Sequence, residues 1–431
     1  MKKITLSRLR PFRAVCTVPG DKSIAHRTLL LGALAGSRTR IQNLPMGQDV
    51  CSTITCLRQL GVPVYVRGIA GGNGEWEVDG SSPSAWREPL TVLNAGNSGT
   101  TVRLLMGASA RLPFTTVWTG DASLVRRSLA AVVRPLRRMG ARIEGRGAGE
   151  YLPLSLRGGS LQGITTTIPQ ASAQTKGCLL LAGLHAEGVT RFREGLPTRD
   201  HTERMLPTFG GLCGREGDWY VVPGGQVLSP ATLWVPGDIS SAAFLLATAL
   251  LTKGGHLRVN RVGLNPYRTG FLRALLRMGA RLHVTVEGIE AGEPWGSITI
   301  SSSSLVGVDI EATQVSTLLD ELPLLAVLAT QAEGVTSVAG AWALRGKETD
   351  RLAATTRTLR SLGAEVEERR DGWVICGPTP LYGCAESWGD HRLAMAWAVA
   401  GCSSQRGITI RGIEAAAVSF PGFFDILRSW G

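Results

Sequence analysis

Apolar and polar positions along the chain follow a pattern that recurs six times. Each instance begins with a Leu- and Ala-rich stretch of helical length, continues through a small or Gly-containing turn, and ends in alternating apolar and polar positions typical of a strand. The six instances are residues 29–44, 104–120, 179–195, 245–262, 324–341 and 395–413. Their regular order predicts a repeated helix–strand unit.

A second pattern follows each instance and consists of a Leu-rich helix end, a Gly and usually a strand. It occupies residues 57–66, 136–145, 205–214, 275–284, 359–368 and 426–431. We expect the Gly to end the helix in the left-handed conformation that other side chains resist. Together the two patterns predict an α/β chain of six units, each with two helices and their strands. An ordinary α/β protein with repeated helix caps is the alternative.

The tetrapeptide Val-Pro-Gly-Asp stands at 18–21, before the first unit, and again at 235–238, between the third and fourth units. Six units would make a very large single core, so we expect two domains of three units. Pro and Gly suit a crossing between domains because one fixes the backbone and the other frees it. The expected domains are 19–236 and 1–18 together with 237–431, with a hinge near both tetrapeptides.

Composition adds a basic surplus to this picture. Of 431 residues 44% are apolar and 19% charged, as in a globular protein, and the formal net charge is +12. Such a surplus suits a nucleic acid, an acidic membrane surface or a cleft for small anions. Lys and Arg are scattered and only 6% of residues are aromatic, which favours small anions over a polymer.

Cysteine usage and the N-terminal residues indicate a cytoplasmic protein. None of the eight cysteines has the spacing of a zinc or redox motif, so we expect reduced thiols. Arg8, Arg10 and Arg13 interrupt the apolar segment that a signal peptide needs. The apolar runs are too short to span a bilayer, so we expect no membrane association.

Basic and polar residues stand where predicted helices begin. The stretch "GDKSIAHR" places Lys22, Ser23 and Arg27 at a helix start, where Ser23 could cap the helix and the free N–H groups favour an anion. A solvated basic helix start is the alternative. The stretch "NAGNSGTTVR" lets the backbone approach closely at Gly99 and offers donors such as Asn97. It is chemically a cradle for a carboxylate or phosphate, although Gly-rich turns are usually structural.

Three further turns contain residues that suit either a site or an ordinary surface. These residues are Arg126 and Arg127 at a predicted helix start, Ser172, Gln174, Lys176, Arg199, His201 and Arg204. The charged neighbours of His201 favour a capping or solvated histidine over a catalytic base.

The second half of the chain is richer in carboxylates. Asp320 and Glu321 come directly before an apolar helix, as helix N-terminal charges or as acid–base groups. The motifs "LRGKETDRL" and "GDHRLAMA" add Arg345, Lys347, Glu348, Asp350, Arg351, Asp390, His391 and Arg392. Cations and a few acids at the turns between repeats indicate a cleft for polyanionic substrates with proton transfer inside it. No His/Cys cluster has metal-ligand spacing.

These motifs, in this order, resemble those of the 5-enolpyruvylshikimate-3-phosphate synthase family over essentially the whole chain. The most specific are "PGDKSIAHR", "GNSGTTVRLL", "DELPLLAV", "LRGKETDRL" and "GDHRLAMA". The resemblance implies transfer of the enolpyruvyl group of phosphoenolpyruvate to the 5-hydroxyl of shikimate 3-phosphate, with release of phosphate and without a metal or other cofactor. It also implies a two-domain inside-out α/β barrel of three βαβαββ units per domain, in a monomer that closes over its substrates and binds no nucleic acid.

The resemblance also implies a role for each matching residue. The catalytic residues would be Lys22, Asp320 and Glu348, with Asp320 as base and Glu348 and Lys22 as candidates for the other proton steps. Shikimate 3-phosphate would be bound by Lys22, Ser23, Arg27, Ser172, Ala173, Gln174, Arg199, Asp320 and Lys347. Phosphoenolpyruvate would be bound by Lys22, Asn97, Gly99, Arg127, Gln174, Arg345, Arg351 and Arg392.

Some positions depart from the best-known bacterial pattern and resemble the second class of the family. Val418 replaces a Lys before the C-terminal "SFP", and "RDHTER" replaces a pattern with Tyr. Members of that class that tolerate glyphosate often have Ala at the position of Gly99. The Gly in this chain leaves room for the inhibitor, so membership of the class does not settle sensitivity to glyphosate. Two alternatives remain: a UDP-N-acetylglucosamine enolpyruvyl transferase, which would have a reactive Cys where residues 103–127 have none, and a non-catalytic basic protein that binds RNA.

Overall fold

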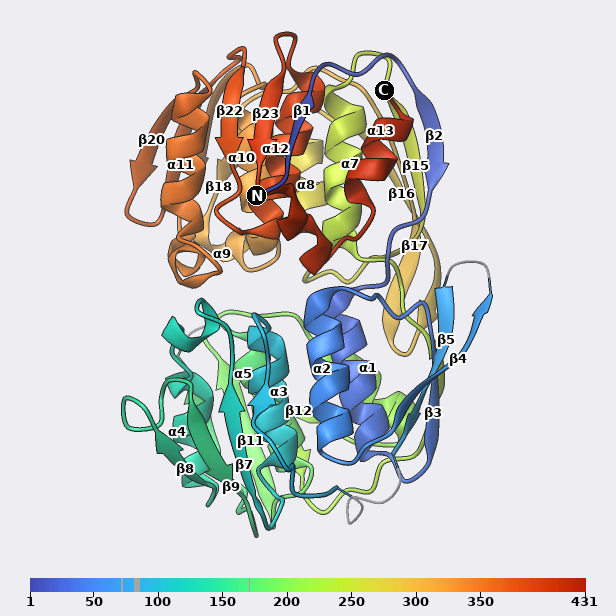
Figure 1. Cartoon of the computed structure of the whole chain (residues 1–431), viewed down its shortest axis with the longest axis vertical. Coiled ribbons are helices and arrows are strands. Elements are labelled where there is room, and N and C mark those ends of the chain that lie inside the picture. Colours follow the sequence, from blue (N-terminus) through green and yellow to red (C-terminus); the bar gives the residue numbers. More distant parts are fainter. Residues whose placement is uncertain (71–72, 81–85, 170) are drawn as a thin grey trace. The chain divides into compact units, whose positions relative to one another are not determined.

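The computed structural model describes residues 1–70, 73–80, 86–169 and 171–431 (Figure 1). The chain divides into two compact units. Unit 1 comprises Met1–Pro19, Gly237–Gly288 and Pro294–Gly431, and unit 2 comprises Gly20–Pro236 and Ile289–Glu293. The chain therefore passes between the units at both Val-Pro-Gly-Asp segments and twice more around residues 289–293.

Unit 2 contains three repeats of the order strand, helix, strand, helix, strand, strand. One repeat is continuous in the sequence and consists of β6 (Leu93–Asn94), α3 (Gly99–Ser109), β7 (Thr115–Thr119), α4 (Ala130–Arg138), β8 (Arg142–Gly145) and β9 (Leu154–Arg157). The next is β10 (Thr165–Ile168), α5 (Ala173–Gly183), β11 (Val189–Glu194), α6 (His201–Met205), β12 (Gly214–Glu216) and β13 (Trp219–Pro223). The third comprises α1 (Lys22–Leu34), β3 (Arg38–Gln42), α2 (Gln48–Gln59), β4 (Val64–Ala70) and β5 (Asn73–Asp79), with β14 (Thr232–Trp234) as its first strand.

Unit 1 repeats the same order and takes two strands from the start of the chain. One repeat is β2 (Arg13–Cys16), α7 (Ile239–Leu251), β15 (His256–Gly263), α8 (Gly270–Arg277), β16 (Arg281–Glu290) and β17 (Glu293–Ser301). The next contains β18 (Asp309–Ile310), α9 (Ala312–Val315), α10 (Leu322–Ala329), β19 (Gly334–Val338), α11 (Arg351–Ser361), β20 (Glu365–Arg369) and β21 (Gly372–Gly377). The last contains β22 (Gly383–Glu386), α12 (His391–Ser403), β23 (Ile408–Arg411) and α13 (Phe423–Ser429), completed by β1 (Lys3–Leu6).

The sheets formed by the described strands share one pairing rule. In each repeat the strand before the first helix pairs in parallel with the strand after it, as β10 does with β11 and β22 with β23. The next strand in the sheet is antiparallel. The N-terminal strands obey the same rule, because β2 is parallel to β15 and β1 is antiparallel to β23. Sequence-distant strands thus complete the repeats.

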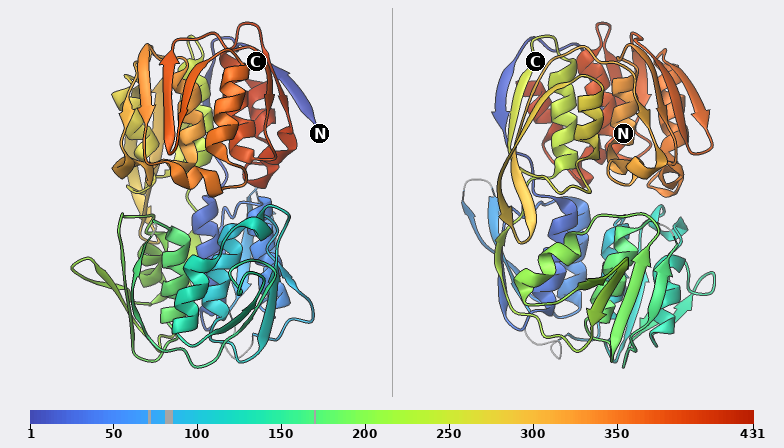
Figure 2. Two further views of the ribbon diagram at one scale, coloured as in Figure 1. Left: turned by 90° about the vertical axis from the view of Figure 1, so that its left-hand side faces the viewer. Right: turned by 180° about the vertical axis from the view of Figure 1, so that it is seen from behind.

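The first helix of each repeat lies inside its unit, with the strands outside (Figure 2). All eight residues of α10 and twelve of the thirteen in α12 are buried, as expected of helices that are apolar on every side. In unit 2, α1 packs against α3 and α3 against α5. This arrangement confirms the predicted α/β fold with repeated βαβαββ units. Among the described residues, no helix is both long and apolar enough to cross a bilayer.

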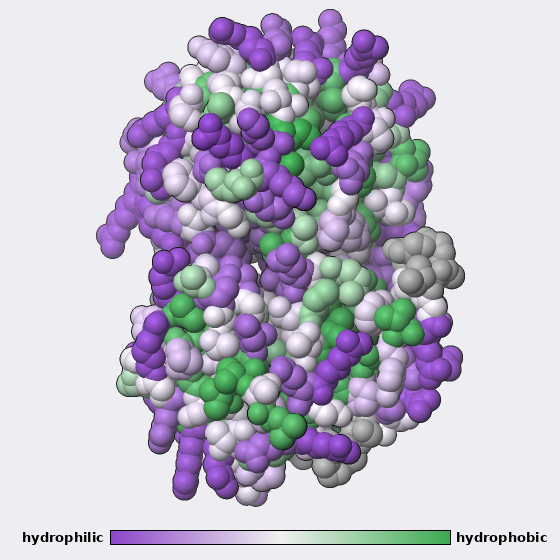
Figure 3. All heavy atoms as spheres, in the orientation of Figure 1, coloured by the Kyte–Doolittle hydropathy of each residue, from purple (hydrophilic) through white to green (hydrophobic). Residues whose placement is uncertain are grey.

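The glycines of the second sequence pattern end helices as predicted. Five of them have positive φ, with values of 85°, 111°, 72°, 90° and 102° at Gly61, Gly140, Gly210, Gly279 and Gly363. Each therefore adopts a conformation that a side chain would disfavour. On the face drawn in Figure 3, hydrophilic side chains are spread over both units with hydrophobic ones between them.

Candidate functional site

The first candidate residues of unit 2 lie at the start of α1. Asp21 is the N-cap, because its Oδ1 accepts a hydrogen bond from the Ile24 N–H at 2.9 Å. The prediction that Ser23 caps this helix is therefore wrong. Asp21 precedes the first helical residue and its side chain reaches forward to an N–H of the first turn, whereas Ser23 is already inside the helix. The carboxylate of Asp49, in the first turn of α2, accepts a 2.8 Å hydrogen bond from Lys22 Nζ.

Arg27 joins three helices of unit 2. Its Nε donates to Thr202 Oγ1 at 2.7 Å, its Nη1 to the Ser23 carbonyl at 2.9 Å and its Nη2 to the Ala173 carbonyl at 3.4 Å. Burial lowers the pKa of Arg27 to about 10, which leaves the side chain charged at neutral pH. The structure thus brings Ser23, Arg27 and Ala173 together.

The start of α5 is fixed by a cap and by a buried cation. Ser172 caps the helix by accepting from the Thr175 N–H at 3.2 Å, and Gln174 is half-buried in the first turn. Lys176 has no exposed side-chain surface, and its Nζ lies 2.9 Å from Glu194 Oε2 and 2.8 Å from Glu203 Oε1. The surface role considered for Lys176 is therefore wrong. Burial alone would lower the pKa of Lys176, but the two carboxylates raise it above its ordinary value.

The segment before and within α6 is tied to the same region. Arg199 is half-buried two residues before α6 begins, and Glu203 links α6 to Lys176 of α5. His201 is only 1% exposed, and its Nδ1 lies 2.8 Å from Glu293 Oε1. The interpretation of His201 as a capping or solvated residue is therefore wrong, because its side chain is buried and paired with a carboxylate. That carboxylate stands 92 positions later in the chain, so no local pattern revealed it.

The Gly- and Asn-rich turn leads into α3 and lies beside Arg127. Ser98 caps α3, and Arg127 Nη2 donates to Asn97 Oδ1 at 2.7 Å. Arg126 and Arg127 do not begin a helix as predicted: they stand at the end of a short 3₁₀ helix, Leu124–Arg126. Gly99 is closely packed, since a Cβ there would lie 2.4 Å from Arg103 Nη1 and 3.7 Å from Arg127 Nη1.

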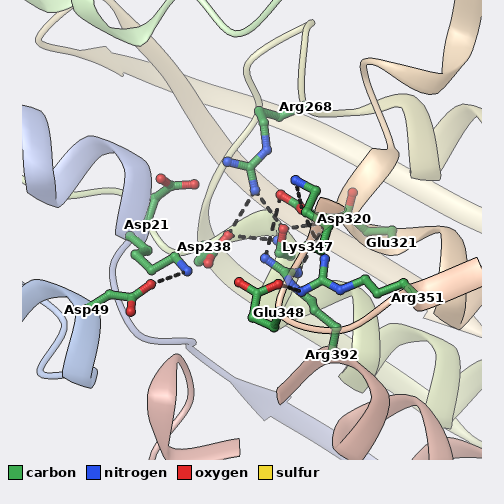
Figure 4. A network of polar contacts seen from close by, with 12 residues as sticks. Asp21, Asp49, Asp238, Arg268, Asp320, Glu321, Lys347, Glu348, Arg351 and Arg392 are labelled. Atoms are coloured by element: carbon green, nitrogen blue, oxygen red, sulfur yellow. Dashed lines mark hydrogen bonds and ion pairs between the residues drawn. The ribbon is translucent and has the colours of Figure 1, made fainter. Parts of the chain in front are cut away.

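In unit 1 three cations converge on Asp320 (Figure 4). Asp320 lies in the 3₁₀ helix Leu319–Glu321 that leads into α10, and its side chain is 13% exposed. Lys347 Nζ and Arg351 Nη1 lie 3.7 Å and 3.6 Å from its Oδ1, and Arg392 Nη2 lies 3.8 Å from its Oδ2. These cations stabilise the negative carboxylate. The structure thus brings together four of the predicted site residues from three separate motifs.

Arg351 is engaged mainly by carboxylates of unit 1. Its Nε donates to Asp390 Oδ2 at 2.7 Å, and its Nη2 donates to Glu348 Oε2 at 2.7 Å. Burial would lower the pKa of Arg351, but Asp390, Glu348 and Asp320 raise it above its ordinary value. Its Nη1 makes no hydrogen bond with the part of the chain that the structure describes. Arg351 thus orients Glu348 and presents one nitrogen beside Asp320.

Two other predicted arginines of unit 1 have contrasting surroundings. Arg392 is 5% exposed, and its Nε and Nη1 make no hydrogen bond within the described residues. A buried guanidinium with such groups is suited to an anionic ligand. Arg345, in contrast, donates to Asp350 Oδ2 and Glu368 Oε1, both at 2.9 Å.

Glu321 belongs to a second network of unit 1 that the sequence did not reveal. Its carboxylate accepts a hydrogen bond from Ser240 Oγ, and its Oε1 lies 3.5 Å from Arg392 Nη1. Arg268 Nη2 donates to the same Ser240 Oγ at 2.6 Å. Asp49 was also missed, although a carboxylate in the first turn of a helix beside a conspicuous lysine motif was an available signal. Within the described residues no group of three or more His, Cys, Asp or Glu could hold a metal ion.

Comparisons with known proteins show which family this chain resembles. The family model described as EPSP synthase (3-phosphoshikimate 1-carboxyvinyltransferase) matches residues 8–427. Relatives named 3-phosphoshikimate 1-carboxyvinyltransferase include one from Desulfitobacterium hafniense, which is 46% identical over 99% of this chain and 97% of its own length. Another, from Geobacillus kaustophilus, is 46% identical over 97% of each chain.

Solved structures agree with these relatives. An EPSP synthase from Acinetobacter baumannii superposes with a TM-score of 0.88 at 39% identity, over 100% of this chain and 98% of its own. The enolpyruvyl transferase NikO from Streptomyces tendae has the same fold, with a TM-score of 0.79 at 18% identity over 99% of this chain and 97% of its own. The family predicted from the motifs is therefore confirmed: the chain belongs to the EPSP synthase family.

Proposed function

We propose that the protein is an enolpyruvyl transferase that joins phosphoenolpyruvate to the 5-hydroxyl of shikimate 3-phosphate and releases phosphate. Its place in the EPSP synthase family supports this reaction. The structural observation that supports it most is the cluster at Asp320, where a carboxylate that could accept a proton lies within 4 Å of three cations that could hold anionic substrates. Proton transfer and anion binding are the two tasks that this reaction demands.

The residues of unit 2 would bind most of shikimate 3-phosphate. The proposed ligands are Lys22, Ser23, Arg27, Ser172, Ala173, Gln174 and Arg199, and unit 1 would add Asp320 and Lys347. The contacts of Arg27 with Ser23 and Ala173 support a shared role for α1 and α5. Free N–H groups at the starts of these helices favour a phosphate.

Phosphoenolpyruvate would be bound through its carboxylate and phosphate by cations and amides. In unit 2 the proposed ligands are Lys22, Asn97, Gly99, Arg127 and Gln174, and in unit 1 they are Arg345, Arg351 and Arg392. The nitrogens of Arg351 and Arg392 that make no hydrogen bond in the described chain support this assignment. Arginine suits both anionic groups because its donors form a planar fork.

The reaction would proceed by addition and elimination. Asp320 would take the proton of the 5-hydroxyl as its oxygen bonds to C2 of phosphoenolpyruvate, while Glu348 or Lys22 delivers a proton to C3. The resulting tetrahedral ketal phosphate would give a proton from its new methyl group to the conjugate base of that acid as the bond from C2 to the phosphate oxygen breaks. The released phosphate carries negative charge that Lys and Arg side chains would stabilise. Asp320 would pass the proton of the 5-hydroxyl to the released phosphate, so no proton is gained or lost over the two steps.

We further propose that the protein acts as a monomer in the cytoplasm. All eight cysteines lie in the described part of the chain and are free thiols, which suits a reducing compartment. Analytical ultracentrifugation of the protein with and without its substrates would measure its mass in solution and test whether it is a monomer.

A phosphate-release assay tests the proposed reaction. Purified protein with phosphoenolpyruvate and shikimate 3-phosphate should release phosphate and form one enolpyruvyl ether for each phosphate, with no added nucleotide. The matched assay replaces the acceptor by UDP-N-acetylglucosamine and should release none. Release with the second acceptor alone would overturn the assignment in favour of the other enolpyruvyl transferase.

A further inference from the structure

Asp121 joins the Gly-rich turn of unit 2 to the segment that contains Arg127. Its Oδ2 accepts from Asn97 Nδ2 at 2.5 Å, and its own N–H donates to the Gly96 carbonyl at 2.8 Å. Its Oδ1 accepts from the backbone N–H groups of Ser123 at 3.0 Å and Leu124 at 2.8 Å. One carboxylate therefore uses one oxygen for the turn and the other for the next segment.

The groups held by Asp121 are also acceptors for Arg127. Arg127 Nη2 donates to Asn97 Oδ1 at 2.7 Å and to Ser123 Oγ at 3.0 Å. Asp121 contacts the side chain of Asn97 and the backbone of Ser123, so it positions both acceptors. The Arg127 guanidinium is oriented through these two residues, although no direct contact with Asp121 is needed.

The chemistry of the three side chains fixes which group donates and which accepts in each hydrogen bond. A carboxylate can only accept hydrogen bonds and a guanidinium can only donate them, so the amide between them must turn its NH₂ to Asp121 and its oxygen to Arg127. We infer that Asp121 is a positioning residue for phosphoenolpyruvate: it fixes the Asn97 amide and thereby aims Arg127. The inference rests on the proposed function, in which Asn97 and Arg127 bind that substrate.

An asparagine at position 121 cannot reproduce this arrangement. Its side chain has the same shape but one oxygen, which can serve either Asn97 or the N–H groups of Ser123 and Leu124. In either orientation its NH₂ group faces another donor. The isosteric change Asp121→Asn should therefore loosen Asn97 or the segment before Arg127 while the fold stays the same.

Steady-state kinetics with both substrates test the inference. Asp121→Asn should raise the KM for phosphoenolpyruvate by about tenfold, because hydrogen bonds to charged groups are among the stronger ones. The KM for shikimate 3-phosphate should stay within about twofold, since its proposed ligands lie elsewhere. Asp79→Asn is the matched control, because Asp79 makes an ion pair of 3.3 Å with the exposed Arg38 and should leave both KM values unchanged.

A second variant distinguishes the loss of the contact with Asn97 from misfolding of the loop. In Asp121→Ser the hydroxyl can still accept from the N–H groups that follow, as Ser does in tight turns, but it is too short to reach Asn97. It should show the same selective rise in the KM for phosphoenolpyruvate with an unchanged thermal unfolding midpoint. An active wild-type protein whose Asp121 variants keep the KM for phosphoenolpyruvate, or raise both KM values equally, would overturn the inference alone. A wild-type protein inactive with both substrates would overturn the proposed function and this inference with it.

Discussion

The Arg351 guanidinium and the Asp390 carboxylate form a buried ion pair in unit 1, with Nε 2.7 Å from Oδ2 and side chains that are 1% and 0% exposed. Asp390 also caps α12 by accepting from the Arg392 N–H at 2.8 Å. One carboxylate thus binds the guanidinium of Arg351 and the backbone N–H of Arg392, and both arginines have side chains beside Asp320. The pair orients Glu348 as well, since Arg351 donates to it.

Removing this carboxylate should cost both stability and activity. Asp390→Ala leaves the buried Arg351 charge without its fully buried partner, so the free energy of unfolding should fall by about 3–5 kcal/mol in urea titrations. Asp425→Ala is the matched control, because Asp425 is 76% exposed in its pair with Arg428 and should contribute less than about 1 kcal/mol. Equal, small losses in the two variants would contradict the organising role of Asp390.

Glu348→Gln should remove proton transfer and keep the geometry of the site. The amide oxygen of Gln can still accept from Arg351, but the side chain can no longer deliver an acidic proton. The kcat should fall by about 10²- to 10⁴-fold, with little change in the dissociation constant of shikimate 3-phosphate. Glu367→Gln is the control, because Glu367 is exposed and pairs with Arg369. Near-normal turnover of Glu348→Gln would remove Glu348 from the proton steps.

Gly99→Ala should weaken phosphoenolpyruvate binding selectively. The new Cβ would meet Arg103 Nη1 at 2.4 Å, and Arg103 would lose its 3.0 Å hydrogen bond to the Gly99 carbonyl as it moves away. The KM for phosphoenolpyruvate should rise by about tenfold, equivalent to the 1.4 kcal/mol that separates decades of affinity. Gly159→Ala, where a Cβ meets nothing within 4 Å, should change neither KM. An unchanged KM in Gly99→Ala would show that this turn does not line the substrate.

The stability of the protein should fall as the pH is lowered below about 6.5, the ordinary pKa of histidine. His26 is fully buried, and burial, with smaller effects of Lys22 and Arg27, lowers its pKa to about 3. Between these two pKa values the unfolded chain binds a proton that the folded chain does not, so the free energy of unfolding decreases with falling pH. The contribution of one such histidine is about 1.4 kcal/mol per pH unit.

Urea titrations of the wild type and His26→Gln between pH 7 and pH 5 measure this contribution. The variant should have a shallower dependence on pH by about 1.4 kcal/mol per unit below the unfolded pKa. His283→Gln is the control, because it removes an exposed histidine instead of a buried one. Identical slopes for the wild type and His26→Gln would contradict a neutral, buried His26.

The repeated architecture could be predicted from the sequence because it depends on local patterns. Apolar helices such as α10 and glycines such as Gly140 recur in a fixed order, and each local signal supports the same unit. The segment Ile289–Glu293, which groups with unit 2, was not foreseen. Its residues contact His201, Arg204 and Trp234 of unit 2, and no local pattern encodes partners so far along the chain.

The charged residues of the candidate site were predicted from the sequence, but the residues that hold them in place were not. Lys22, Asp320 and Arg392 stand in distinctive motifs, whereas Asp49 and Ser240 look like ordinary first-turn residues until the fold brings their partners close. Burial was the other missing quantity. Nothing in a single Lys or His distinguishes an exposed side chain from one whose charge is balanced by carboxylates of other helices.

Turnover in D₂O with shikimate 3-phosphate and phosphoenolpyruvate tests the central claim most directly, followed by NMR of the isolated product. If an acid protonates C3 and a proton then leaves the methyl group, solvent deuterium must enter the vinyl methylene. We expect an enolpyruvyl ether on the 5-oxygen, one phosphate per ether and deuterium at that carbon. A failure to form the ether, or an ether whose methylene holds no deuterium, would contradict enolpyruvyl transfer by addition and elimination.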